Sequence, residues 1–484
     1  MTSHFFTTLR FVISHFSTRR ICRTVDVVVI SLVALLGGSI TRAADLTIQE
    51  TIATATRAKM RVLESRHLVL ITDRPERRGD GIEEFPGYFD EAVEQWCKRL
   101  SIDAVIAQPW KTVGCLIVDR NRFRSIGLLP DSIPPFKNGY CNLDRFWLMD
   151  QSSPYYRRHL FLHEGVHSIA TTLRHAETDA WYTEGLAELL STHRIEDGHC
   201  VLTPIPESSA DVQQLGRIEA LREARLSGKA KSIEEVFASP PDSHFHVSSY
   251  AWNWAAVAML TEHPRYAAAM SKLQQGPLDQ SFTARLLASA DINQEILIRD
   301  FDAFSDDVDY GYRFSHSAVD WLAEESLTDQ KTVVVNSSRG WQSAGIFLSR
   351  GDRVRFTAKG RFTLGSISPE IDQSGSPLTL TSEADGITLE WYRGRPLGRL
   401  LVSQWIDHAP LVSSRVAKPK DDRLKKDHGH FDTRPGFFIL ETGQSAEFVA
   451  AFDGPLFCKM NDFPRSLADN TGTLDVTFKR LNSQ

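Results

Sequence analysis

The residue pattern of this chain changes at about Thr328, and that change limits the folds open to it. From Asp45 to about Ala323, short apolar runs are interspersed with segments long enough for amphipathic helices. From Thr328 to Gln484 the apolar runs are all short and are separated by Gly, Ser, Asn and Asp. Strands followed by helices are typical of an α+β domain, and many short strands between turn residues are typical of a sandwich or jelly roll. The sequence therefore predicts an α+β domain over 45–323 and an all-β jelly-roll or sandwich domain over 328–484.

The N-terminus has the three parts of a secretory signal. Four arginines precede an apolar run of 14 residues, Val27 to Ile40, and small residues follow near Ala43. This arrangement predicts a signal peptide at 1–43; a membrane anchor is the alternative, although the run is short for a bilayer span. We expect a chain that is secreted, periplasmic or at the cell surface, with no stable membrane span after signal removal.

The net charge argues against one class of partner. Without residues 1–43 the chain loses five arginines and one aspartate, so its formal net charge falls from −6 to −10. Nucleic-acid-binding domains usually carry clustered basic residues, and no such cluster dominates this sequence. We therefore expect no nucleic-acid partner.

Residues 161–167 read FLHEGVH, with two histidines four apart and a glutamate directly after the first. On a helix that begins at Pro154, His163 and His167 share one face. The opposite face carries the apolar residues Leu162, Val166, Ile169 and Leu173. Histidine nitrogens are good zinc ligands, and a catalytic zinc needs a third protein ligand as well as an open position. The motif therefore predicts two ligands of a zinc site.

A second acidic motif follows at WYTEGLAEL, residues 181–189. Together the two motifs resemble the gluzincin metallopeptidases, a peptidase MA-like group with a zincin fold, whose third ligand is a glutamate in an aromatic-x-x-Glu-Gly-Phe-Ala context. The resemblance implies that Glu184 is the third zinc ligand, although the 16 residues after His167 make a shorter connection than in that family. Glu188 is either a partner that orients a ligand or the ligand itself. His175 and Asp179 are further alternatives for the third ligand.

The same resemblance implies roles in catalysis. Glu164 would accept a proton from the zinc-bound water and pass it to the leaving amine. Tyr250, in a serine-tyrosine context, would donate to the oxyanion, with His244 or His246 as substitutes and simple packing as the bland alternative. The Gly-Ala-Met-Glu-Asn run of aminopeptidases is missing from the sequence, so an endopeptidase or processing enzyme is expected. The 139–150 region could pair with the substrate backbone as an edge strand.

The C-terminal domain ends in a loop rich in oxygen ligands. Asn461-Asp462-Phe463-Pro464 and Asp469-Asn470-Thr471-Gly472 resemble the calcium-binding loop of the galactose-binding PA-IL-type lectins. Carboxylate, amide and carbonyl oxygens suit calcium, although Asn, Asp and Gly also dominate ordinary turns. The resemblance implies side-chain ligands from Asp462, Asp469 and Asn470 and backbone ligands from Ser466 and Leu364. The glycan ligand is less defined, and a β-domain that only supports the peptidase is an alternative.

The leading hypothesis is thus an exported zinc peptidase that acts on peptide or protein substrates and carries a lectin-like module. It requires Zn²⁺ and would also use Ca²⁺ and a glycan ligand. The rival hypothesis is a secreted calcium-dependent carbohydrate-binding or adhesion protein with a non-catalytic zincin domain.

Overall fold

The computed structural model describes residues 46–77, 79–240, 247–371, 377–407 and 435–481. The chain divides into two compact units, Met1–Thr51 and Ile52–Gln484. The first unit contributes only residues 46–51 to the described part of the chain, and these include the start of helix α2 (Ile48–Arg57). The predicted signal peptide at 1–43 lies outside them. Among the helices that are described, none is long and apolar enough to cross a membrane.

A five-stranded sheet begins the larger unit, in the strand order β1-β2-β3-β5-β4. Its strands are β1 (Arg61–Glu64), β2 (Leu68–Thr72), β3 (Thr112–Ile117), β4 (Gly139–Asn142) and β5 (Arg145–Met149). Strands β2 and β3 are buried along their whole length, which explains why their apolar residues do not alternate with polar ones. β2, β3 and β5 are parallel, whereas β4 is antiparallel to β5 and ends the strand order. The apolar runs at 67–73 and 113–119, whose residues favour strands, form β2 and β3, and the 139–150 region forms β4 and β5.

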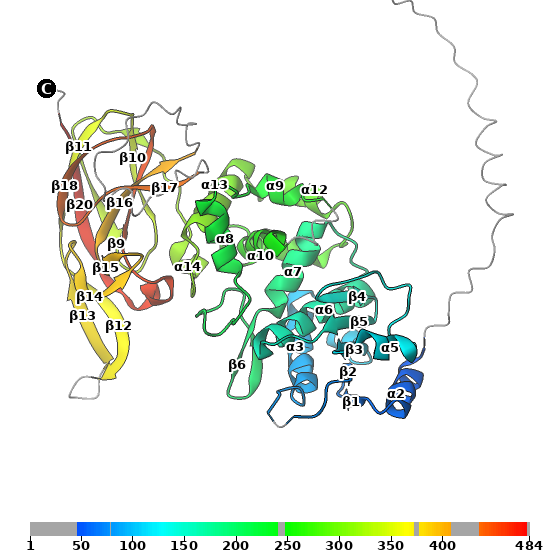
Figure 1. The fold of residues 1–484 in the computed structure, drawn as a ribbon. Coiled ribbons are helices and arrows are strands. Elements are labelled where there is room, and N and C mark those ends of the chain that lie inside the picture. Colours follow the sequence, from blue (N-terminus) through cyan, green and yellow to red (C-terminus); the bar gives the residue numbers. More distant parts are fainter. Residues whose placement is uncertain (1–45, 78, 241–246, 372–376, 408–434, 482–484) are drawn as a thin grey trace, which may run out of the picture. The chain divides into compact units, whose positions relative to one another are not determined.

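Helices pack on this sheet and on one another (Figure 1). They are α3 (Phe85–Arg99), α4 (Ala104–Ala107), α5 (Arg120–Ser125), α6 (Pro154–Arg174), α7 (Ala180–Ser191), α8 (Arg217–Leu226), α9 (Ile233–Phe237), α10 (Val247–Glu262), α11 (Ala267–Gln275), α12 (Phe282–Leu287), α13 (Gln294–Asp307) and α14 (Phe314–Ser317). Aromatic rings join α3, β5 and α6, because Phe161 lies edge-on to Phe146 and Phe89 at centroid distances of 5.0 and 5.8 Å. One hydrophobic core thus supports both the sheet and the helix that carries the histidine motif.

One predicted helix is too long. The pattern over 177–195 suggests a single helix, but α7 ends at Ser191, and β6 (His193–Glu196) follows, pairing with β7 (His199–Leu202). The two-residue connection Asp197-Gly198 has φ values of 52° and 84°. An Asp-Gly pair with both residues at positive φ is the favoured two-residue hairpin turn. This turn lets the chain leave the helix and return as a hairpin.

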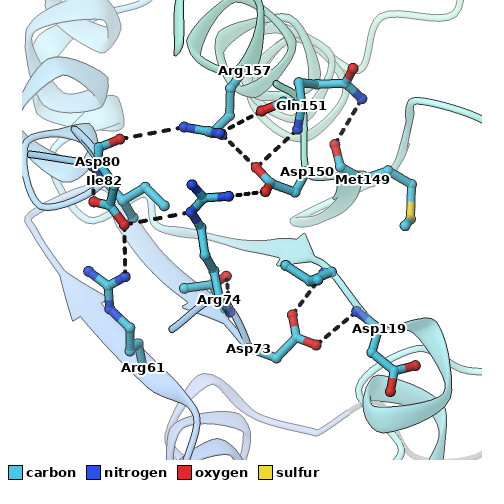
Figure 2. Close-up of polar contacts among 12 residues, drawn as sticks. Arg61, Asp73, Arg74, Asp80, Ile82, Asp119, Met149, Asp150, Gln151 and Arg157 are labelled. Carbon is cyan, nitrogen blue, oxygen red and sulfur yellow. Dashed lines mark hydrogen bonds and ion pairs between the residues drawn. The ribbon is translucent and has the colours of Figure 1, made fainter. Parts of the chain in front are cut away.

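An ion-pair network fixes the start of α6 (Figure 2). Arg157 on α6 donates to Asp150 (2.6 Å) and to the Asp80 carbonyl (3.4 Å). Arg74, which follows β2, also donates to Asp150 and lies 3.6 Å from the Asp80 carboxylate. Arg157 and Asp80 are almost fully buried, with 3% and 5% of their side chains exposed. The network therefore ties the segment after β2 to the N-terminal turns of α6.

The C-terminal part of the larger unit is built from strands. One sheet has the order β17-β16-β19-β10-β8, and another has the order β13-β12-β20-β11-β18, with β9 also paired to β20. The strands are β8 (Glu325–Ser326), β9 (Gln330–Asn336), β10 (Gln342–Leu348), β11 (Arg353–Lys359), β12 (Phe362–Ile371), β13 (Pro377–Ser382), β16 (Leu400–Ile406), β17 (Gly436–Thr442), β18 (Ser445–Val449), β19 (Gly454–Met460) and β20 (Thr471–Leu481), with the separate hairpin β14 (Ile387–Tyr392) and β15 (Arg395–Leu397). Residues of both large sheets, such as Val402 and Phe356, share one hydrophobic cluster. The described chain is thus a mixed α/β protein with several sheets.

Candidate metal centre

Helix α6 places the histidine motif where the sequence predicts it. The Ser153 hydroxyl caps the helix by accepting a hydrogen bond from the Tyr156 amide (3.2 Å), and Pro154 occupies its first turn. Both features are typical of a helix start. Leu162, Val166 and Ile169 are buried, as predicted, and Leu173 is half-buried.

Glycines in the two motifs allow close packing of the helices that carry them. A Cβ on Gly165 would lie 2.5 Å from a ring carbon of Phe89 and 2.8 Å from one of Trp96, so α6 approaches α3 closely only with glycine here. A Cβ on Gly185 would overlap the Asn253 carbonyl and lie 2.6 Å from Val257 of α10. The glycine after Glu184 therefore brings α7 against α10.

Three predicted ligands meet at one point. His163 Nε2 and His167 Nε2 are 3.1 Å apart, and Glu184 Oε2 lies 3.3 Å from the first and 3.5 Å from the second. A tetrahedral zinc with bonds of about 2.0–2.1 Å separates its ligand atoms by about 3.3–3.4 Å. The residues thus have the spacing of three ligands on one face of a tetrahedron, and these buried or half-buried groups could hold a metal ion.

The charges of these groups also favour a cation. Burial lowers the pKa of His163, but its contacts with Glu184 and Glu188 outweigh this effect and raise the pKa to about 10. Burial raises the pKa of Glu184, but His167 and His163 more than compensate and hold it well below its usual range. His163 is therefore held in its protonated form beside ionised glutamates, and a metal ion bound here would take the place of that proton.

Glu164 lies beside this cluster and reaches the end strand of the sheet. The residue is 6% exposed, and burial raises the pKa of its carboxyl group. A Cβ on Gly139 of β4 would lie 2.9 Å from Glu164 Cδ and closer still to Oε1. The glutamate of the motif therefore points at β4, and glycine at 139 leaves room for its carboxylate.

Tyr250, at the start of α10, belongs to the same site. Its ring centroid is 6.0 Å from that of His163, and the Arg217 guanidinium lies 5.3 Å from the Tyr250 centroid. Burial, together with Glu184, Glu188 and Glu164, raises the pKa of its hydroxyl, which therefore stays protonated and able to donate. The predicted substitutes His244 and His246 lie outside the described residues.

The other candidates for the third ligand lie outside the triangle of His163, His167 and Glu184. His175 is exposed in a left-handed conformation at the end of α6, and Asp179 accepts a hydrogen bond from Thr283. Glu188 forms a second cluster with His159 and His163. The residue is 1% exposed, and Arg217 and His159 outweigh the effect of burial and hold the pKa of its carboxyl group well below the usual value. Glu188 is thus placed behind His163, on the side away from Glu184.

Sequence reasoning missed two residues of the site. His159 precedes His163 by one turn, so the spacing of histidines along α6 could have pointed to it. Arg217 lies on α8, 29 residues after Glu188, and no sequence pattern links the two. Only the packing of the helices shows that they meet.

Three of the residues predicted to bind calcium, Asp462, Asp469 and Asn470, lie in the loop between β19 and β20. The Asn470 amide donates to Asp462 (2.7 Å), and its oxygen accepts from the Gly365 amide (3.0 Å), next to Leu364. A Cβ on Gly365 would overlap the Asp469 carboxylate. Ser466 lies on the short helix η2 (Pro464–Asp469), between these residues. Burial raises the pKa of Asp462 to about 6, and the nearby carboxylates Asp469 and Glu390 add to the rise.

Comparison with known proteins gives little support for an assignment. No protein-family model matches the chain, and no curated protein matches it. Among solved structures, the chain is similar to one described as "EclA N-terminal domain; PllA-like lectin", at 14% sequence identity and a TM-score of 0.19. The similarity covers 33% of this chain and 100% of that one. A TM-score this low carries no argument about fold or activity.

Proposed function

We propose that this protein is an exported zinc-dependent peptidase of the gluzincin type, with a zincin-like domain over 45–323 and a calcium-binding, lectin-like β-sandwich over 328–484. The observation that carries the proposal is the triangle of His163, His167 and Glu184 atoms, with sides of 3.1, 3.3 and 3.5 Å. Three protein ligands leave a fourth position for water, as in catalytic zinc sites. A zinc ion bound there would supply Lewis acidity and an activated water.

The chain's own residues supply the remaining functions of a peptidase. Glu164 lies beside the three ligands, and its raised pKa suits a group that accepts a proton and then donates it to a leaving amine. Tyr250 has a protonated hydroxyl on a ring that lies next to the His163 ring, and we assign it the donation to a developing oxyanion. The proposed roles therefore fall on residues that adjoin one another.

Strand β4 gives the substrate a place to bind. It is paired with β5 on one side and ends the strand order of its sheet among the described residues. An extended peptide can add to such an edge through backbone hydrogen bonds. Because Gly139 of β4 adjoins Glu164, a peptide bound along this edge would place its backbone next to the proton acceptor. An endopeptidase or processing enzyme fits this arrangement.

The decisive experiment measures zinc content and proteolysis in the purified mature chain. We expect one zinc per chain and cleavage of a denatured protein, with zinc retained but cleavage lost in Glu164→Gln. His167→Asn should lose zinc, whereas the matched control His175→Asn, at the C-terminal cap of the same helix and outside the cluster, should keep both zinc and activity. A chain without zinc, or equal activity in wild type and Glu164→Gln, would refute the proposal.

The rival function is calcium-dependent carbohydrate binding, which the grouping of Asp462, Asp469 and Asn470 favours. A glycan array with and without a chelator tests it separately from the peptidase. Binding that needs calcium and is lost in Asp462→Asn would support the lectin-like module. If that binding persists while Glu164→Gln has no effect on any peptide, the rival replaces the peptidase.

A further inference from the structure

Arg217 binds the Glu188 carboxylate through two hydrogen bonds in a buried place. Its Nε donates to Glu188 Oε2 (2.7 Å) and its Nη2 donates to Oε1 (2.8 Å). The arginine is 8% exposed and the glutamate 1% exposed. A two-point contact between a guanidinium and a carboxylate fixes the orientation of both groups. Glu188 is therefore held as an ionised carboxylate in one position.

The carboxylate held in this way faces the rear nitrogen of a proposed metal ligand. Glu188 Oε1 lies 3.3 Å from His163 Nδ1, whereas His163 Nε2 lies 3.3 Å from Glu184 on the other side of the ring. A histidine offers Nε2 to a metal only when Nδ1 carries the proton. An ionised carboxylate next to Nδ1 favours that tautomer by its charge, although the contact is not aligned as a hydrogen bond.

The second histidine–glutamate cluster is already neutralised by Arg217. His159, His163 and Glu188 could hold an ion by the spacing of their atoms alone, and Glu188 Oε2 lies 3.3 Å from His159 Nε2. Both oxygens of Glu188, however, accept from the guanidinium, which places a permanent positive charge at this cluster. A cation bound there would lie against that charge, so the structure favours one metal ion at the triangle formed with Glu184.

Arg217 also contacts the proposed oxyanion donor. Its guanidinium carbon is 5.3 Å from the centroid of the Tyr250 ring, within the range of a cation–π contact. Arg217 on α8 therefore contacts both Glu188 on α7 and the ring of Tyr250 on α10.

We propose that Arg217 is a positioning residue that sets the zinc affinity of the site by holding Glu188 against His163. The inference rests on the proposed zinc site and adds a residue that does not touch the metal. It predicts that loss of the guanidinium weakens zinc binding even where the fold is intact.

The test compares zinc affinity in Arg217→Met, Arg217→Lys and a matched control. Arg225 lies on the same helix, is 7% exposed and pairs with Asp306 at 3.0 Å, so Arg225→Met removes a buried arginine without touching Glu188. Competition with a chromophoric chelator gives the zinc dissociation constant, and circular dichroism verifies folding. We expect Arg217→Met to weaken binding by about 10–100-fold, the usual effect of losing a partner behind a ligand. The zinc dissociation constant of Arg217→Lys should lie between those of wild type and Arg217→Met, and that of Arg225→Met should equal the wild-type value.

A double variant separates positioning from general destabilisation. If Arg217 acts through Glu188, then Arg217→Met combined with Glu188→Gln should bind zinc no more weakly than Glu188→Gln alone. Additive losses, or wild-type affinity in folded Arg217→Met, would overturn the role of Arg217. If Arg217→Met does not fold, the same comparison is made with Arg217→Lys, alone and combined with Glu188→Gln. A wild-type chain that binds no zinc would instead refute the proposed function.

Discussion

Gly139→Ala separates catalysis from metal binding more cleanly than removal of a ligand does. The new Cβ would lie 2.9 Å from Glu164 Cδ and 3.1 Å from its Cγ, and closer still to Oε1. Carbon atoms in ordinary contact are about 3.5–4.0 Å apart, so the Glu164 carboxyl group must retreat by about 1 Å. Gly139 does not have a positive φ, so alanine fits the backbone of β4.

A displacement of this size has a defined cost. Misplacing a catalytic group by about 1 Å can lower the rate by about 100-fold. Because the three atoms nearest to the added Cβ all belong to Glu164, zinc content should stay at the wild-type level. We therefore expect Gly139→Ala to keep its zinc and its fold while kcat/KM falls about 100-fold.

The assay uses a quenched fluorescent peptide cut by the wild-type protein, with zinc measured on the same preparations. Gly87→Ala is the control, since Gly87 lies on α3 with no atom within 4 Å of an added Cβ. It should retain full activity. Wild-type kcat/KM in Gly139→Ala would show that Glu164 is not the proton acceptor, or that β4 does not border the reacting atoms.

Three other predictions concern stability and calcium. Burial lowers the pKa of His193 to about 3, and Arg158 and His159 add to this effect against the Ser191 carbonyl. The histidine of the unfolded chain binds a proton below about pH 6.5, so the stability that neutral His193 contributes is present above that pH and is lost as the pH falls, by about 3 kcal/mol at pH 4.5. The unfolding free energy of His193→Gln in urea should therefore depend less on pH than that of wild type. The same dependence on pH in both proteins would contradict this. Gly185→Ala, which would overlap the Asn253 carbonyl, should lower the unfolding free energy by about 1–3 kcal/mol, and an unchanged urea midpoint would count against the close contact of α7 and α10. Millimolar calcium should raise the melting temperature of wild type but not of Asp462→Asn in a thermal scan, and an equal rise in both would remove Asp462 from the calcium site.

Local patterns predicted that His163 and His167 lie side by side on one helix. Two histidines four apart on a helix must share a face, and Ser153-Pro154 marks where that helix starts. Glu184 needed more than spacing, because nothing in the periodicity of α7 distinguishes it from Glu188. The resemblance to gluzincins supplied that choice, and the structure places Glu184 beside both Nε2 atoms.

Contacts between distant segments could not be predicted in this way. Arg217 reaches Glu188 only because α8 packs against α10, which in turn packs against α7. Gly139 meets Glu164 because the chain turns back after β4 to form β5 before α6 begins. The end of α7 could have been predicted locally, because an Asp-Gly pair such as Asp197-Gly198 is typical of a hairpin turn. The apolar pattern before this pair instead suggested a helix that extended too far.

The facing side chains of α6 and α7 repeat after one helical turn. His163, His167 and Glu184 form one set, and His159, His163 and Glu188 form another of nearly the same composition. A search for metal sites by residue type and spacing would therefore accept two positions about 5.4 Å apart along the helix. The guanidinium of Arg217 distinguishes them, because it makes the two sets unequal in charge. Searches for sites of this kind should therefore score the arginine together with the ligands, as a residue that selects the turn at which an ion binds.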